Sequence, residues 1–129
     1  MVRQVIKTDA APAAVGPYAQ GVSANGFVFS AGQLPIDPSS GTIPATVAGQ
    51  TKQSLDNVAA VLAAGGATMN TVVKTTVFLK NMNDFSAMNA VYEKYFEAGN
   101  APARSTVEVA RLPRDVLVEI EAIALVEKA

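Results

Sequence analysis

Apolar residues occupy every second position near the C-terminal end of the chain. In the segment DVLVEIEAIALVE, the even-numbered positions are all apolar: Val116, Val118, Ile120, Ala122, Ala124 and Val126. Side chains of a β-strand point alternately to its two faces, so this spacing predicts a strand with one wholly apolar face. The odd-numbered positions combine Glu119 and Glu121 with large apolar residues. We therefore expect a mixed opposite face, whereas an ordinary solvent face would be polar throughout.

A second strand pattern with a mixed face precedes this one, in the segment PARSTVEVA. Alternation assigns the side chains to two faces of this strand. One face has Arg104, Thr106, Glu108 and Ala110, and the other has Ser105, Val107 and Val109. We expect the charges of both strands, Arg104 among them, to lie on the face of the sheet that no helix covers. By pattern alone, these charges could instead form structural salt bridges at a subunit interface, and that alternative stays open.

Helical and strand patterns alternate along the rest of the chain. Strand patterns cover residues 2–8, the segments on both sides of the dipeptide Asn25-Gly26, and residues 71–81. Asn25-Gly26 favours a type I′ turn, so the two segments beside it are predicted to form a hairpin. Apolar residues at helical spacing predict one helix over 46–64 and a second from Asn83 or Asp84 to Gly99. The order β-ββ-α-β-α-ββ predicts a single two-layer α+β domain over residues 1–129, with both helices on one face of the sheet.

The face without helices needs another cover. Large apolar residues on that face, such as Ile123 and Leu125, would be exposed in a chain that has no spare element. Packing against further copies of the same chain would remove them from water, so the pattern indicates a homo-oligomer. Charged side chains at such a junction would be partly desolvated, which strengthens their interaction with a complementary ligand.

Residue composition excludes several kinds of chemistry. The 129 residues include no cysteine, histidine or tryptophan, which excludes thiolate nucleophiles, Ser-His-Asp triads, disulfides and zinc sites built from cysteine or histidine. Proton transfer at neutral pH then falls to carboxylates, lysine, tyrosine or water. Carboxylate chemistry in a shielded site is the leading option.

Charge and hydropathy narrow the set of partners. Ten basic residues stand against 11 acidic ones without a basic run, so we expect no nucleic-acid partner. No segment approaches the roughly 18 consecutive apolar residues of a membrane span, and the N-terminal part has no secretory leader pattern. We therefore expect a cytoplasmic protein that binds neither nucleic acid nor membrane.

Five segments of the chain form a characteristic set. They are APAAVGPYAQGV, AGQLPIDPSSGTIP, QTKQSLDNVAAVL, VVKTTVFLKNMNDFSAMNAVYEKYF and PARSTVEVARLPRDVLVEIEAIA, and together they span most of the chain. This set resembles the Rid family of reactive-intermediate deaminases, the YjgF-type proteins. The resemblance implies a chorismate-mutase-like α+β subunit with a mainly antiparallel sheet, a homotrimer, and ligand clefts between neighbouring subunits. It also implies hydrolysis of 2-imino acids, such as 2-iminobutanoate and 2-iminopropanoate, to 2-oxo acids and ammonia without a metal or organic cofactor.

The resemblance further assigns roles to individual residues. Arg104, in PARS, resembles the family's clamp on the substrate carboxylate. Glu119, in VEIEAIA, resembles the glutamate that positions and activates water. Tyr18 in GPYAQG, Asn89 in NAVYEKYF and Gly32 in AGQ resemble residues of the ligand cleft. We interpret Glu121 as structural.

Two positions of the same cleft depart from the family pattern. Thr106 stands where many relatives have cysteine, and Ala31 stands where many have serine before the glycine. A threonine hydroxyl still forms hydrogen bonds but lacks the polarisability of a thiol. We count both residues as substrate-binding positions and expect them to influence rate or substrate preference.

Two other functions are alternatives to hydrolysis. A trimer that binds a small carboxylate, or acts like a chaperone, would need Arg104 but would not require Glu119. A nucleic-acid function, described for some relatives, is disfavoured because the chain has no histidine for ribonuclease chemistry and no basic stripe.

Overall fold

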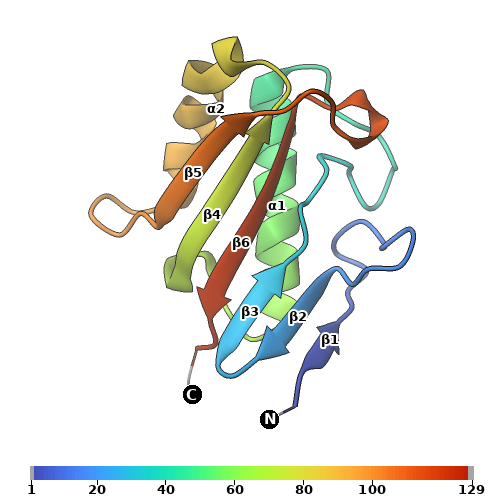
Figure 1. Cartoon of the computed structure of the whole chain (residues 1–129), viewed down its shortest axis with the longest axis vertical. Helices are drawn as coiled ribbons and strands as arrows, with labels where there is room; N and C mark the ends of the chain where they lie inside the picture. Colours follow the sequence, from blue (N-terminus) through green and yellow to red (C-terminus); the bar gives the residue numbers. More distant parts are fainter. Residues whose placement is uncertain (1, 128–129) are drawn as a thin grey trace.

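The computed structural model describes residues 2–127, which form a six-stranded sheet and two α-helices (Figure 1). The strands are β1 (Gln4–Ile6), β2 (Gly21–Ala24), β3 (Phe27–Ser30), β4 (Val72–Leu79), β5 (Ala103–Glu108) and β6 (Val118–Leu125). The helices are α1 (Val47–Ala64) and α2 (Phe85–Tyr92). Within the described residues, no helix is long and apolar enough to cross a membrane.

The last strand of the chain lies inside the sheet, because the spatial order is β1-β2-β3-β6-β4-β5. Neighbouring strands are antiparallel except for β4 and β5, which are parallel. A parallel pair needs a crossover connection, and the segment containing α2 supplies it. The predicted α+β architecture with a mainly antiparallel sheet is confirmed. Although β5 and β6 are consecutive in sequence, they do not pair, because β4 lies between them.

Local sequence signals account for the hairpin and the long helix. Asn25 and Gly26 have φ angles of 51° and 82°, the left-handed values that a type I′ turn between β2 and β3 requires. The hydroxyl oxygen of Thr46 caps α1 by accepting a hydrogen bond of 3.0 Å from the backbone N–H of Gly49. Both elements occupy the residues that the sequence predicts.

The second helix is shorter than its sequence pattern predicts. Instead of extending to Gly99, α2 ends at Tyr92 and continues as a 3-10 turn over Glu93–Tyr95. Tightening of this kind is common at helix ends. Tyr92 and Phe96 nevertheless stay buried, and their ring centroids lie 4.7 Å apart. Asp84 occupies the N-cap position but makes no capping hydrogen bond with its side chain.

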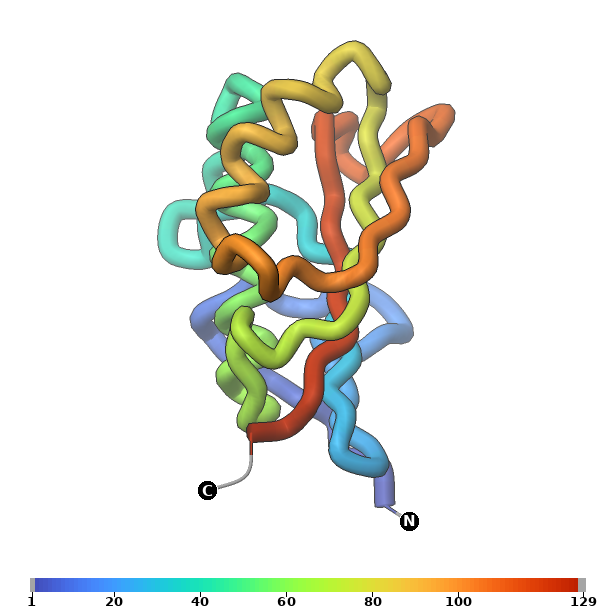
Figure 2. Tube along the Cα trace, turned by 90° about the vertical axis from the view of Figure 1, so that its left-hand side faces the viewer, coloured from blue at the N-terminus to red at the C-terminus, as the bar shows by residue number. Residues whose placement is uncertain are grey.

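Both helices cover the same face of the sheet, as the view from the side shows (Figure 2). The even-numbered side chains of β6 are buried against them, as the alternation predicts. On the opposite face, Phe29, Val107 and Leu125 are 42%, 41% and 43% exposed. The chain therefore leaves large apolar side chains open on the face that has no helix.

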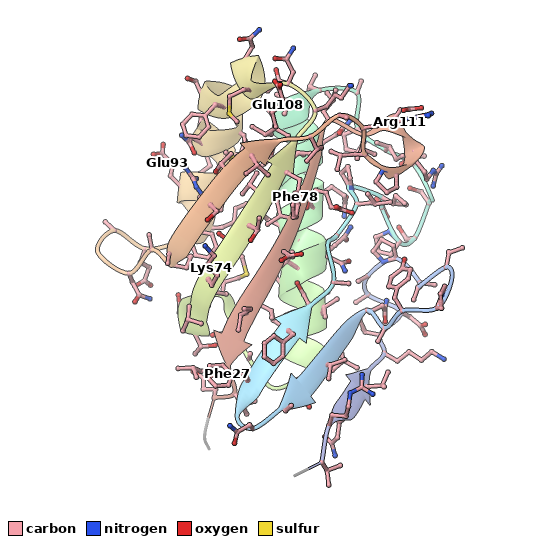
Figure 3. All side chains as sticks on the ribbon, in the orientation of Figure 1. Phe27, Lys74, Phe78, Glu93, Glu108 and Arg111 are labelled. Atoms are coloured by element: carbon pink, nitrogen blue, oxygen red, sulfur yellow. The ribbon has the colours of Figure 1, made fainter. Side chains whose placement is uncertain are left out.

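The expected position of Arg104 is wrong. In the parallel register Arg104 pairs with Thr75, which is buried and shares a hydrogen bond of 2.7 Å with Tyr92 of α2. Arg104 therefore points toward the helices. Glu119 pairs with Phe78, which lies on the helix-free face turned toward the viewer in Figure 3. Because both faces of the edge strand β5 are mixed, alternation alone could not tell which one meets α2.

Candidate functional site

The seven predicted site residues form two groups on opposite sides of the sheet. One group surrounds Glu119 and contains Tyr18, Ala31 and Gly32. The other group surrounds Arg104 and contains Asn89 and Thr106. Within one chain, the two groups do not face a common space.

A hollow of about 740 Å³ marks the first group. Its walls include Tyr18, Ala31, Gly32 and Glu119, together with apolar side chains such as Val15, Leu34 and Ile36. Volumes of this size are typical of small-molecule sites. We call this space the Glu119 hollow.

Gly32 lies directly against the carboxyl group of Glu119. A Cβ atom at position 32 would lie 2.8 Å from Cδ of Glu119 and 3.0 Å from its Oε2. Carbon atoms do not approach so closely without displacement, so any larger residue would push the carboxyl group away. The glycine is required here by close approach of the backbone to a side chain.

The segment that carries Gly32 is fixed by hydrogen bonds on both sides of the glycine. Ala31 donates its backbone N–H to the carbonyl oxygen of Gln20 at 2.8 Å, and Gln33 donates to that of Ile120 at 2.8 Å. From α1, the hydroxyl of Ser54 donates to the carbonyl oxygen of Gln33 at 2.7 Å. These bonds hold the backbone of residues 31–33 against β6 and so determine the distance between Gly32 and Glu119.

The surroundings of Glu119 alter its acidity. Burial raises the pKa of Glu119, and the negative charge of Glu121 on the same face of β6 adds to the rise. Glu119 is half-buried, while Glu121 is exposed. A carboxyl group with a raised pKa accepts and returns protons more effectively near neutral pH, as a general base or acid must.

Tyr18 lies in the loop before β2. The residue is 53% exposed, and its hydroxyl oxygen accepts a hydrogen bond of 3.2 Å from the backbone N–H of Val15. Nearby, the buried side-chain amide of Gln20 bonds to the backbone of Thr8, Ala11 and Pro12. Gln20 therefore anchors the loop that presents Tyr18 to the Glu119 hollow.

Aromatic rings and one amide surround the guanidinium of Arg104 in the second group. Its Nη1 donates a hydrogen bond of 2.7 Å to Oδ1 of Asn89 on α2. Its Cζ lies 4.7 Å from the ring centroid of Tyr92 and 5.5 Å from that of Phe85. Within residues 2–127, Arg104 forms no ion pair with a carboxylate. The guanidinium is therefore held in place while other donors remain available to an anionic ligand.

Thr106 lies two residues further along β5, on the same side as Arg104. Its Oγ1 is buried and has no hydrogen-bond partner among the residues that the structure describes. A buried hydroxyl without a partner is costly, so this oxygen is suited to a ligand or water beside the arginine. Among the same residues, no three carboxylate, histidine or cysteine side chains gather as metal ligands.

Sequence comparison places the chain among known proteins. The family described as Endoribonuclease L-PSP matches residues 8–126. The 2-iminobutanoate/2-iminopropanoate deaminase of Escherichia coli K12 is 54% identical over 124 residues, which cover 95% of this chain and 97% of that protein. The chain belongs to the Rid (YjgF) family. Its recognition from sequence motifs is thereby confirmed.

Solved structures of Rid-family proteins have the same fold. The YjgF gene product of E. coli superposes with a TM-score of 0.91 at 53% identity, covering 96% of this chain and 99% of that one. E. coli TdcF with bound serine gives a TM-score of 0.90 at 46% identity, covering 95% and 98%. The predicted fold class is confirmed by both likenesses.

The sequence did not predict several residues that hold the backbone of the candidate site in place. Gln20 anchors the Tyr18 loop, while Ser54 and Asn57 of α1 bond to the backbone of residues 33–36. Polar residues on the otherwise apolar inner stripe of a helix were the signal that could have revealed the last two. Nothing in strand periodicity marks Gln20.

Proposed function

We propose that the chain hydrolyses 2-imino acids, such as 2-iminobutanoate and 2-iminopropanoate, to 2-oxo acids and ammonia. The observation that carries this proposal is the complementary chemistry of the two groups. One offers a positioned guanidinium that has no ion-pair partner among residues 2–127, and the other offers a carboxyl group with a raised pKa beside Gly32. The name of the similar E. coli deaminase supports the same reaction.

We infer that a complete site forms between copies of the chain, assembled as a homotrimer. Arg104 points to the helix side of the sheet and Glu119 to the other side, so one chain cannot bring both to the same small molecule. The open apolar side chains of the helix-free face, including Phe29 and Leu125, support association through that face. Arg104 of one copy would then meet the Glu119 hollow of the next.

The proposed reaction needs only these residues and water. Arg104 holds the substrate carboxylate, with Thr106 as a neighbouring donor. Glu119 of the adjacent copy accepts a proton from water as the water oxygen bonds to the imine carbon. The proton is returned to nitrogen to give the carbinolamine. The hydroxyl proton of the carbinolamine then moves to the same nitrogen, the C–N bond breaks, and ammonia leaves as the C=O bond of the 2-oxo acid forms. Positioning supplies most of the acceleration, because an imine carbon is already electrophilic.

The direct test adds purified protein to an enzymatic source of 2-iminobutanoate and measures ammonia release above the spontaneous rate. We expect a clear acceleration, and a decrease of about tenfold to a hundredfold in kcat/KM for Arg104→Ala because a charge-assisted hydrogen bond to the carboxylate is lost. No acceleration at any protein concentration would refute hydrolysis.

A carboxylate-binding role without catalysis would give another result. Binding of 2-oxobutanoate that depends on Arg104, with no ammonia release, would favour this alternative. An RNA-directed role, suggested by the description Endoribonuclease L-PSP, has less support because the chain has a net charge of -1 and no histidine. Retention of the protein on RNA at physiological salt would support it.

A further inference from the structure

The connection between β5 and β6 forms one wall of the Glu119 hollow and has an unusual backbone. Arg114 and Asp115 have φ angles of 57° and 55°, so two consecutive residues other than glycine adopt left-handed conformations. Such conformations cost energy and persist only where the surroundings enforce them, often at functional sites. This connection therefore needs a reason beyond joining two strands.

Buried side chains and an exposed ion pair flank Arg114 in this turn. Leu112 and Val116 are 5% and 1% exposed, and they anchor the two ends of the turn. Arg111 binds the carboxylate of Asp115 through Nε at 2.7 Å and Nη2 at 3.2 Å. The turn thus holds Arg114 at the rim of the hollow and uses a different arginine for its internal ion pair.

The side chain of Arg114 supplies the only positive charge among the described lining residues of the Glu119 hollow. The ion pairs of residues 2–127 are Lys52 with Asp56 and Arg111 with Asp115, so Arg114 is not engaged in one. Its donors are therefore available to an anionic group of a ligand.

The Glu119 hollow carries one charged side chain of each sign. In a single chain it measures about 740 Å³, and a neighbouring copy that brings Arg104 to it would occupy part of this space. Apart from Glu119 and Arg114, its lining side chains are apolar or neutral. A second anionic group on the substrate would find one complementary charge here, at Arg114.

We propose that Arg114 recognises a distal carboxylate, and that 2-imino dicarboxylic acids are substrates of this site. This inference rests on the proposed function, because the reacting end of the substrate is treated in the same way. Water adds to the C=N carbon with transfer of one proton to nitrogen. The resulting hydroxyl gives its proton to the same nitrogen as the C–N bond breaks, and ammonia and a 2-oxo dicarboxylic acid are released. Arg104 holds the carboxylate beside the imine, and Arg114 holds the second one.

The test compares 2-iminoglutarate with 2-iminobutanoate, each generated from its amino acid by an amino-acid oxidase in the presence of catalase. Arg114→Asn removes the charge while keeping a residue that tolerates left-handed backbone, and Arg114→Lys retains the charge. Lys94→Asn is the control, because it removes one positive charge from an exposed position of the 3-10 turn after α2.

We expect Arg114→Asn to lower kcat/KM for 2-iminoglutarate by about tenfold or more, through the loss of a charge-assisted hydrogen bond. The same variant should change kcat/KM for 2-iminobutanoate by less than about twofold, since that substrate has no second carboxylate. Arg114→Lys should lose less kcat/KM for 2-iminoglutarate than Arg114→Asn loses. Lys94→Asn should change kcat/KM for neither substrate.

Equal losses for both substrates, no loss for either, or no activity of the unaltered protein on 2-iminoglutarate would overturn the inference. Calorimetric binding of 2-oxoglutarate and 2-oxobutanoate separates this failure from failure of the proposed function. If the protein deaminates neither imine but binds 2-oxoglutarate in an Arg114-dependent way, the second anion site stands and the hydrolytic function falls.

Discussion

Glu119 and Arg104 acquire different properties from their surroundings. Glu119 is half-buried near a second carboxylate, and its pKa is raised. Arg104 is held by Asn89 and by the faces of two aromatic rings, which fix its orientation without neutralising it. Each environment suits the role proposed for that residue, one in proton transfer and the other in holding an anion.

The contribution of Glu121 to the pKa of Glu119 gives a test of acid–base function. Glu121→Gln removes a nearby negative charge, so the pKa of Glu119 should fall. Because the base is active when ionised, the acidic limb of the kcat/KM profile should move to lower pH. Glu93→Gln, an exposed change in the 3-10 turn after α2, should leave the profile in place. An unmoved acidic limb in Glu121→Gln would show that Glu119 does not control the rate.

The hydroxyl of Thr106, which has no hydrogen-bond partner within the described part of the chain, predicts opposite effects on stability and binding. Thr106→Val replaces a buried polar atom with a methyl group of similar size, so the ligand-free protein should gain about 1 kcal/mol in free energy of unfolding. KM for 2-iminobutanoate should rise because a donor beside Arg104 is lost. Denaturant unfolding and steady-state kinetics measure the two effects. A loss of stability would mean that the hydroxyl is satisfied in the assembled protein.

At the scale of elements, α1 does more than cover the sheet. Ser54 and Asn57 lie on its buried side and bond to the backbone of residues 33–36. Buried backbone carbonyls need such partners, since they cannot reach water. The helix thereby fixes the segment that places Gly32 against Glu119, although α1 contributes no residue to the predicted site.

Ser54→Ala tests this link between helix and site. The carbonyl oxygen of Gln33 would lose its bond to the hydroxyl, and we expect a loss of about 1–3 kcal/mol in free energy of unfolding. kcat should also fall, because Gly32 and Glu119 would no longer be held at a fixed distance. Lys52→Ala, on the exposed side of α1, is the control and should reduce neither quantity by a comparable amount. If kcat is unchanged in Ser54→Ala, catalysis does not depend on this hydrogen bond from α1.

At the scale of the whole molecule, the position of β5 at the sheet edge determines how a site can be built. β5 lies beyond β4 and carries Arg104 on the helix side, whereas β6 carries Glu119 on the other side. A site that uses both must therefore join two copies.

Complementation between inactive variants tests this arrangement. Arg104→Ala and Glu119→Gln should each have little activity alone. After the two are unfolded, mixed in equal amounts and refolded, about a quarter of the sites should combine an intact Arg104 with an intact Glu119 from different copies. Recovery of about a quarter of the original activity is expected, measured as ammonia release. Absence of recovery, with assembly shown by light scattering, would contradict a site shared between copies.

The sequence by itself determined the first helix, the start of the second, the hairpin and the apolar face of β6. These features depend on local rules: the alternation of side chains in a strand, the spacing of apolar residues in a helix, and the backbone angles of Asn25 and Gly26. The family motifs added the candidate residues, because they identify positions without needing to place them in space.

Only the tertiary structure decided which face each charge occupies and what supports it. The helix-side position of Arg104 follows from the parallel pairing of β5 with β4, which no pattern within β5 reveals. The contact of Gly32 with Glu119 and the hydrogen bond from Ser54 to Gln33 each join residues that are distant in sequence. The strained backbone of Arg114 depends on its buried neighbours. Such relationships depend on long-range packing, and periodicity along the chain carries no information about them.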